Sequence, residues 1–301
     1  MRYPWSPPVS SGRDGQEKPR MREVIESRVK VNGLELALFE WPGEGRPIFL
    51  AHATGFHARC WDQVVERLPG RHCYALDMRG HGRSEKPAPP YLWLNFAQDV
   101  AALARLLGLR DALGVGHSKG GYAVARAAAM EPGAFAKLLL IDPVIMPRPA
   151  YAAFPLTEHF ASRRRNEWAS AEEMFERFKD RPPFDRWDPA VLRDYCVYGL
   201  QPAASGEGFV LACPPEIEAA TYLGSAGGDP YDDIESLTIP VRVLRARARA
   251  EGAPLDMSGS PTNPHLAEHL QQGEDVYLAE HSHFIPMEAP GLVAKHIEEL
   301  A

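Results

Sequence analysis

The stretch "GVGHSKGGYAVARAAA", residues 114–129, decides how this chain folds. It begins as a small apolar strand, turns at Ser118 between two glycine-bearing flanks, and continues as an alanine-rich helix. The pattern G-x-S-x-G, from Gly116 to Gly120, forces a serine onto a sharp turn, so that its hydroxyl stands exposed above a sheet. Free backbone N–H groups and the positive end of the helix dipole lie beside that oxygen. We interpret Ser118 as a candidate nucleophile.

Short apolar runs alternate with helical stretches around this turn. The strand-like runs are 47–52, 72–77, 112–117 and 136–142, and the helical stretches among them are 60–68 and 96–108. Upstream, the pair Asn32-Gly33 separates two β-type runs, which predicts an antiparallel hairpin at the start of the sheet. The alternation that follows predicts a parallel sheet with helices on both faces.

The alternation stops after about residue 143. The next ninety or so residues are helical and aromatic in pattern, and strand-like runs return only at 240–246 and 275–280. A helical stretch at 263–272 lies between these two runs. This change of pattern predicts a separate helical layer that is inserted between two strands of one sheet.

The chain therefore divides into three predicted parts. Residues 23–143 and 235–301 form one α/β core, and residues 144–234 form the inserted layer. Residues 1–22 are rich in proline, serine, glycine and charge and show no period. Such a composition predicts a disordered N-terminal tail.

The composition argues against several classes of partner. The chain has 33 basic and 40 acidic residues, mixed along its length, for a formal net charge of −7. This balance predicts neither a nucleic-acid-binding face nor a membrane-binding basic run, and no segment approaches the roughly 20 apolar residues of a membrane span. The arginine run 163–165 is interpreted as a solvated helix face. We expect a small-molecule acyl substrate and a monomer or homodimer.

Cysteine usage predicts the compartment and argues against a metal site. The four cysteines are far apart and form no Cys-x-x-Cys pair; they are Cys60, Cys73, Cys196 and Cys213. No secretory segment precedes the core pattern, so we expect reduced thiols and a cytoplasmic protein. We expect no metal ligand and no cofactor.

A serine hydroxyl is a poor nucleophile until a base takes its proton, so the hypothesis requires a histidine. The stretch "AEHSHFIPMEAP" supplies two, His281 and His283. His283 follows the last strand-like run and precedes a helix start, which brings its loop to the same sheet edge as Ser118. The pattern "HFIPMEAP" favours His283 over His281 as the base.

Several stretches together resemble the α/β-hydrolase family. They are "LAHATGFHARCWDQV" (50–64), "DMRGHGRSEKP" (77–87), "GVGHSKGG" (114–121), "LLLIDP" (138–143) and "HFIPMEAP" (283–290). The resemblance covers nearly everything from Val24 onward. It implies an eight-stranded, mostly parallel sheet with an inserted helical cap, Ser118 as nucleophile and His283 as base.

The same resemblance implies an oxyanion hole formed by the backbone N–H groups of Thr54 and Lys119. The family usually shows His-Gly where this chain has His52-Ala53. We expect the alanine methyl to narrow the entrance of the hole without removing the donor. The side chain of Lys119 has two interpretations: it enters the pocket, or its stem lies over apolar surface while its charge reaches water.

The acid that orients the histidine has three candidates. Asp256 leaves one helical stretch and one strand before His283, which is the spacing that the resemblance leads us to expect. Asp142 ends the sixth strand, where some relatives keep their acid, but "IDP" also occurs there as a structural turn. Glu251 is the third candidate. We prefer Asp256 and keep Asp142 as the alternative.

These residues predict a cofactor-independent serine hydrolase of carboxylic esters or related acyl compounds, acting through an acyl-enzyme. Four other reactions fit the same scaffold: a lactonase, a thioesterase, a carbon–carbon hydrolase and a cofactor-free perhydrolase. A different class also remains open, because a ligand receptor can keep the whole site and hydrolyse slowly or not at all.

Overall fold

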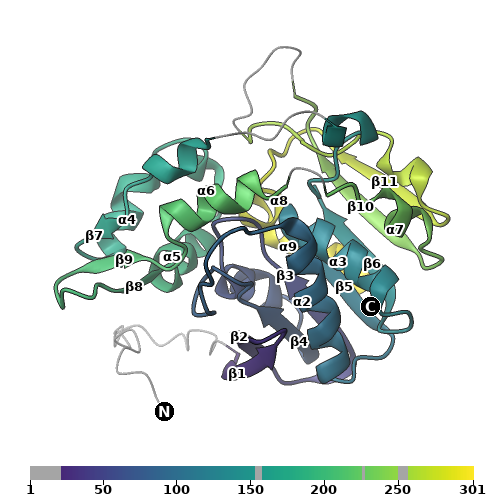
Figure 1. Cartoon of the computed structure of the whole chain (residues 1–301), viewed down its shortest axis with the longest axis horizontal. Helices are drawn as coiled ribbons and strands as arrows, with labels where there is room; N and C mark the ends of the chain where they lie inside the picture. The colour runs from purple at the N-terminus through teal and green to yellow at the C-terminus, as the bar shows by residue number, and fades with distance from the viewer. Residues whose placement is uncertain (1–21, 153–157, 226–227, 250–256) are drawn as a thin grey trace, which may run out of the picture.

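An eight-stranded sheet forms the centre of the molecule (Figure 1). The computed structural model describes residues 22–152, 158–225, 228–249 and 257–301. The strand order is β1-β2-β4-β3-β5-β6-β10-β11. The strands are β1 (Ile25–Val31), β2 (Leu34–Trp41), β3 (Glu44–Ala51), β4 (Arg71–Leu76), β5 (Ala112–His117), β6 (Phe135–Ile141), β10 (Val241–Ala246) and β11 (Gly273–Leu278).

Strand β2 runs antiparallel to β1 and β4, and the other neighbouring strands pair in parallel. The predicted hairpin is present, because Asn32 and Gly33 both have positive φ, 49° and 82°, as a type I′ turn requires. The prediction of a mostly parallel eight-stranded sheet is confirmed.

Side chains on the strands alternate between two buried faces. On β3, Ile48 and Leu50 join one hydrophobic cluster, and Phe49 and Ala51 join the other. Both faces are covered because each cluster includes helical residues. One face packs against α2 (Trp93–Leu106), α3 (Lys119–Met130) and α7 (Tyr231–Glu235), and the other against η1 (Ala58–Trp61), α1 (Asp62–Val65), α8 (Ile285–Glu288) and α9 (Pro290–Leu300). This double burial explains the near-continuous apolar strand sequences.

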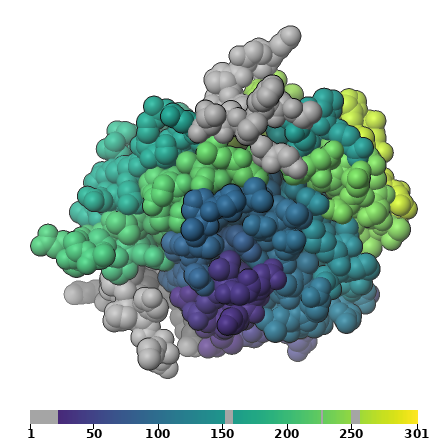
Figure 2. Space-filling model, viewed as in Figure 1, coloured from purple at the N-terminus to yellow at the C-terminus, as the bar shows by residue number. Residues whose placement is uncertain are grey.

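Between β6 and β10 the chain leaves the sheet. We call residues 158–223 the cap segment; they lie to one side of the main sheet in Figure 1 and form one continuous surface with the core in Figure 2. The elements after β6 are η2 (Arg148–Ala152), η3 (Phe160–Arg163), β7 (Glu167–Trp168), α4 (Ala171–Phe178), η4 (Phe184–Arg186), α5 (Pro189–Tyr198), β8 (Leu200–Pro202), β9 (Phe209–Leu211) and α6 (Pro215–Leu223).

Two features differ from the predicted pattern. The cap segment contains a small antiparallel sheet, β7-β9-β8, whose strands of two or three residues are too short to show an alternating pattern. The predicted helix over 263–272 is wrong, since only a 3₁₀ turn, η5 (Leu266–His269), forms there. Leu270 is already extended, and the carbonyl of Gln272 accepts from Val241 at 3.0 Å, so the chain has begun to enter the sheet.

Some predictions lie outside the described residues. They include the disordered tail, of which the structure describes only Arg22, and any account of residues 250–256. The four cysteines are buried and carry free thiols. Within the described ranges, no helix is long and apolar enough to span a membrane, and no group of three or more ligand-type side chains is arranged to hold a metal ion.

Candidate active site

Ser118 stands on the turn between β5 and α3. Its backbone has φ 58° and ψ −122°, a conformation that residues other than glycine rarely adopt. A strained backbone of this kind costs on the order of 1–3 kcal/mol and persists only where the surrounding structure holds it. The turn leaves the serine side chain 6% exposed at the carboxyl end of the parallel strands.

The two motif glycines make the turn sterically possible. A Cβ on Gly116 would lie 2.4 Å from the carbonyl oxygen of Gly120, and a Cβ on Gly120 would lie 2.2 Å from that of Ala51. Both distances are far below van der Waals contact. The glycines therefore allow α3 to approach β3 and β5 closely, which explains the spacing G-x-S-x-G in physical terms.

The structure brings His283 to the serine. The Nε2 atom of His283 lies 2.9 Å from Oγ of Ser118, and its Nδ1 atom lies 2.6 Å from Oδ2 of Asp142. A carboxylate can only accept, so Nδ1 carries a proton and Nε2 is free to accept from the serine hydroxyl. The rival, His281, lies elsewhere, with its Nδ1 3.2 Å from Glu288.

Asp142, the alternative acid of the sequence analysis, is the residue that contacts His283. Asp256 and Glu251 lie outside the described residues, and the Nδ1 position at which either would act is taken by Asp142. The physical reason lies in the sheet: β6 and β11 both flank β10, so the ends of β6 and β11 stand only one strand apart. The number of residues between an acid and His283 in the sequence does not reveal that these two strand ends are close in space.

The carboxylate of Asp142 is held by three further donors. Its Oδ1 accepts from the backbone N–H of Ala246 at 2.9 Å, from Ser260 Oγ at 2.5 Å and from Thr262 Oγ1 at 3.2 Å. Asp142 is fully buried and has a positive φ of 40°. A buried carboxylate needs such donors, and they leave Oδ2 directed to the imidazole.

A second histidine fixes the position of the first. The Nε2–H of His117 donates to the backbone carbonyl of His283 at 2.8 Å, and the two rings lie 5.1 Å apart. Burial, together with the nearby charge of His283, lowers the pKa of His117 to about 3. His117 therefore stays neutral and does not oppose a positive charge on His283.

The loop of Thr54 follows β3, the strand next to β5. The ring of His52 fixes this loop: its Nδ1 donates to Ala53 at 2.7 Å and its Nε2 accepts from Met78 N–H at 3.0 Å. The methyl group of Ala53 packs in a hydrophobic cluster with cap residues. Among the described residues, no acceptor is found for the backbone N–H of either Thr54 or Lys119. Two free N–H groups, one on the residue after Ser118 and one on the loop after the neighbouring strand, can serve as oxyanion donors.

The side chain of Lys119 follows neither of its two interpretations. It is fully buried, so its amine does not reach water, and it does not contribute to the cavity described below. The Nζ atom lies 3.8 Å from the ring centroid of Phe96 and has no hydrogen-bond partner among the described groups. Desolvation lowers the pKa of this amine well below its usual value.

A cavity of about 380 Å³ lies between the core and the cap segment. From the core it is lined by Thr54, Phe56, Met257 and Phe284, the last of which adjoins His283. Cap residues supply most of the remaining wall, with many aromatic side chains and four arginines. The cavity therefore adjoins the candidate oxyanion loop and the histidine loop together.

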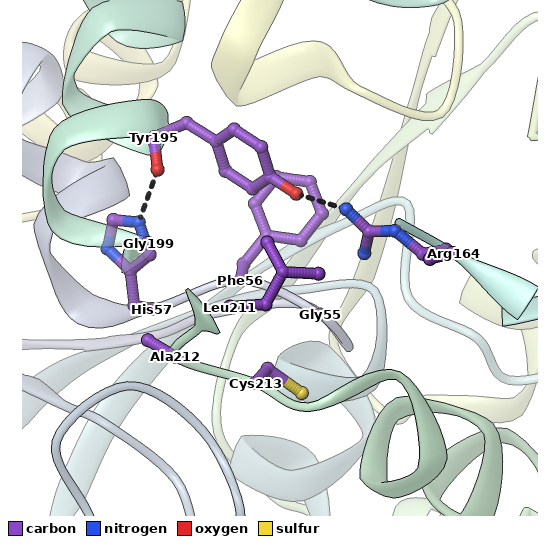
Figure 3. Close-up of a pocket in the computed structure, with 9 residues that line it drawn as sticks. All are labelled: Gly55, Phe56, His57, Arg164, Tyr195, Gly199, Leu211, Ala212 and Cys213. Atoms are coloured by element: carbon purple, nitrogen blue, oxygen red, sulfur yellow. Dashed lines mark hydrogen bonds between the residues drawn. The ribbon is translucent and has the colours of Figure 1, made fainter. Parts of the chain in front are cut away.

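A smaller cavity of about 10 Å³, enough for roughly one water molecule, lies beside it (Figure 3). Phe56, Arg164 and Tyr195 line both cavities and form the wall between them. Arg164 donates to the hydroxyl of Tyr195 at 2.8 Å, and His57 contacts the Tyr195 carbonyl at 3.2 Å. The contact of His57 fastens α5 of the cap segment to the core, whereas the contact of Arg164 joins two parts of the cap segment.

Comparison with known proteins identifies the family. Residues 48–296, more than half of the chain, match the family model described as the alpha/beta hydrolase family. The chain is similar to a non-heme chloroperoxidase of Streptomyces lividans, with 40% identity over 117 residues that cover 38% of this chain and 42% of that protein.

Two further similarities concern one kind of enzyme. A 2-(acetamidomethylene)succinate hydrolase of Mesorhizobium japonicum is 33% identical over 119 residues, which are 39% of this chain and 42% of that protein. The crystal structure of an E-2-(acetamidomethylene)succinate hydrolase matches with a TM-score of 0.73 at 21% identity, covering 92% of this chain and 99% of that one. The sequence matches thus span less than half the length of these two relatives, whereas the fold matches over nearly all of both chains.

Proposed function

This chain belongs to the alpha/beta hydrolase family, and we propose that it is an enzyme that cleaves carboxylic esters or related acyl compounds through an acyl-enzyme on Ser118. The observation that carries the proposal is the hydrogen-bonded chain from Ser118 through His283 to Asp142, with separations of 2.9 Å and 2.6 Å. A serine, a histidine and a buried carboxylate in this order provide a nucleophile, a base and a group that orients the base.

In the first half-reaction, Nε2 of His283 takes the proton of Ser118 as Oγ bonds to the substrate carbonyl carbon. The carbonyl oxygen becomes an oxyanion, and the N–H groups of Thr54 and Lys119 donate to it. When the tetrahedral intermediate collapses, the leaving group takes the proton from His283 and departs. The acyl group stays on Ser118.

In the second half-reaction, His283 removes a proton from water, whose oxygen attacks the acyl carbon. Collapse of the second intermediate returns the proton to Oγ of Ser118 and releases the carboxylic acid. Asp142 accepts the Nδ1–H bond throughout, which holds the productive tautomer and stabilises the imidazolium form. These steps use only groups of the chain and water.

The domain boundaries, the compartment and the oligomeric state are further proposals. We propose that residues 144–234 form the cap of a core built from 23–143 and 235–301, and that the protein acts in the cytoplasm as a monomer or homodimer.

Replacement of Ser118 tests the proposal most directly. Ser118→Ala should retain the fold and lose several orders of magnitude of turnover on a panel of esters, amides, lactones and thioesters. A fluorophosphonate should label Ser118 in the native protein, as detected by mass spectrometry of the labelled peptide. Turnover that survives in Ser118→Ala would refute the mechanism. No turnover of any panel member by the wild-type protein would favour the ligand-receptor alternative.

A cofactor-free perhydrolase is the second candidate, because the chain is 36% identical over 117 residues to a bifunctional esterase/perhydrolase of Acinetobacter calcoaceticus. In that reaction hydrogen peroxide replaces water as the acceptor of the acyl group. The test is peracid formation from hydrogen peroxide and a short carboxylic acid, measured with wild type and Ser118→Ala. A rate well above that of ester hydrolysis would make this the main activity.

A further inference from the structure

The cavity beside Thr54 concentrates positive charge. Four arginines contribute to its lining, Arg164, Arg165, Arg177 and Arg181, against a single carboxylate, that of Glu218. The chain as a whole carries a net charge of −7. A positively lined cavity in an acidic protein attracts anions selectively, because the surrounding surface repels them.

Two of the four arginines already have partners. Arg164 forms an ion pair with Glu218 and donates to Tyr195. Arg165 pairs with Glu173 at 2.6 Å and lies 4.1 Å from the ring centroid of Trp168. Their charges are therefore balanced within the chain.

Arg177 and Arg181 remain. Both are exposed at the end of α4, and the side chain of neither has an ion pair within 4.0 Å or a hydrogen bond among the described residues. The N–H of Ala169 and the side chain of Arg165 are the main causes that lower the pKa of Glu173, and the charge of Arg177 adds the least, so this acid is already engaged. Two guanidinium groups thus face a cavity with their hydrogen-bonding capacity unused by the described chain.

Aromatic side chains form much of the remaining wall. Phe178, between the two free arginines in sequence, stacks on Phe184 with ring centroids 4.3 Å apart, and Phe184 meets Trp187 edge-on at 4.8 Å. Trp187 in turn lies 5.7 Å from Phe56, which borders the Thr54 loop. The wall therefore continues as packed rings from the arginines to the candidate oxyanion site. It suits an apolar or unsaturated chain that separates an anion from a carbonyl.

We propose that the substrate carries a carboxylate on its acyl portion, which Arg177 and Arg181 bind while the scissile carbonyl reaches Ser118. This inference rests on the proposed function. A guanidinium group binds a carboxylate through two parallel hydrogen bonds, which fixes position as well as charge. A phosphate on the leaving group, as in a coenzyme A thioester, offers similar chemistry, but the packed aromatic wall between the arginines and the Thr54 loop favours a compact acid.

The test compares two substrates that differ only in charge. Monoethyl succinate carries the carboxylate, and ethyl 4-methylpentanoate replaces it with an isopropyl group of similar shape. Butyryl-coenzyme A represents an anion on the leaving group. Wild type, the double variant Arg177→Gln/Arg181→Gln and the control Arg163→Gln are measured with all three. Arg163 is exposed on the same segment but does not line the cavity.

We expect the double variant to lose about 10-fold or more in kcat/KM for monoethyl succinate, mainly through KM, because charge-assisted hydrogen bonds are lost. Ethyl 4-methylpentanoate should change less than about threefold, and Arg163→Gln should behave as wild type. Equal losses on the two esters, or no loss on either, would overturn the proposal. A loss confined to butyryl-coenzyme A would also overturn it and assign the arginines to a leaving-group phosphate.

A binding measurement separates this inference from the proposed function. Trp168 and Trp187 line the cavity, so tryptophan fluorescence of Ser118→Ala can be titrated with monoethyl succinate. The dissociation constant should rise about 10-fold or more when Arg177 and Arg181 are replaced in this background. If wild type hydrolyses none of the esters but this difference is present, the proposed function fails and the anion site stands. If monoethyl succinate binds Ser118→Ala no more tightly than its neutral analogue, the anion site fails.

Discussion

The buried amine of Lys119 makes a prediction about stability that is open to direct measurement. An ammonium group over the Phe96 ring gains about 2 kcal/mol from a desolvated cation–π contact. Removing it from water costs several kcal/mol, which this contact does not offset. The neutral amine is therefore the buried form, in agreement with the lowered pKa. Folding must then release the proton that this lysine carries in the unfolded chain.

The sign of the pH dependence follows from that release. Because the unfolded chain binds one proton more than the folded chain, stability rises with pH until the unfolded lysine loses its proton near pH 10.4. Each pH unit in this range contributes about 1.4 kcal/mol. Over the pH range in which the buried amine is neutral and the unfolded lysine is charged, Lys119 therefore destabilises the protein, and it does so more strongly at the lower pH. Methionine has nearly the same shape and no proton to release.

We therefore expect Lys119→Met to be more stable than wild type at pH 8, with a gain of about 1.4 kcal/mol for each pH unit over which the buried amine is neutral and the unfolded lysine is charged. The gain should shrink to under about 1 kcal/mol at pH 10. Urea unfolding of both proteins across pH 7.5–10 measures the difference between their free energies of unfolding. The titrations of all other groups are common to both proteins and cancel in this difference. Lys295→Met, at an exposed position of α9, is the matched control and should show no such trend. A less stable variant, or a gain that does not change with pH, would refute the reasoning.

Three further predictions concern single positions. Asp142→Asn should fold yet lose about 10⁴-fold in kcat, measured on the best ester of the panel, because an amide favours the wrong tautomer of His283; a loss under tenfold would return the role to an acid such as Asp256. Gly120→Ala should fail to accumulate as folded protein in a circular-dichroism melt, since its Cβ would lie 2.2 Å from the Ala51 carbonyl oxygen, and a normal melt would contradict that geometry. Arg164→Met should destabilise the fold by about 3–5 kcal/mol in urea unfolding, because it strands the buried carboxylate of Glu218; the double replacement with Glu218→Gln should recover most of the loss.

The features that the sequence predicts correctly are local. The Asn32-Gly33 turn, the strand-to-helix turn at Ser118 and the alternation of short strands with helices each depend on residues close together in the chain. The backbone alone restricts such turns to glycine-rich patterns, so a single sequence contains the whole signal. The strands β7, β8 and β9 carry no such signal, because two or three residues do not establish a period.

The contact between Asp142 and His283 depends on tertiary structure, and the spacing of residues along the chain does not predict it. Asp142 follows β6, His283 follows β11, and the donor Ala246 ends β10 between them. Which acid meets the histidine depends on the order of strands in the sheet rather than on the distance along the chain. The hydroxyls of Ser260 and Thr262 are a sequence signal for this acid site. A buried carboxylate requires hydrogen-bond donors, and both hydroxyls follow β10 in the chain.

The roles of the arginines in the cap segment likewise cannot be predicted from the sequence alone. The run 163–165 has the composition of a solvated face, and Arg163 is indeed exposed, yet Arg164 beside it pairs with a buried glutamate in the cavity wall. Arg177 and Arg181 are also exposed, and neither is paired within the described chain, which leaves them free for a ligand. The chemistry of an exposed arginine therefore depends on whether a cavity lies next to it, and that follows from how the cap segment packs on the core. Under the proposed function, substrate specificity depends on how the cap segment packs on the core, whereas reactivity depends on the turn at Ser118.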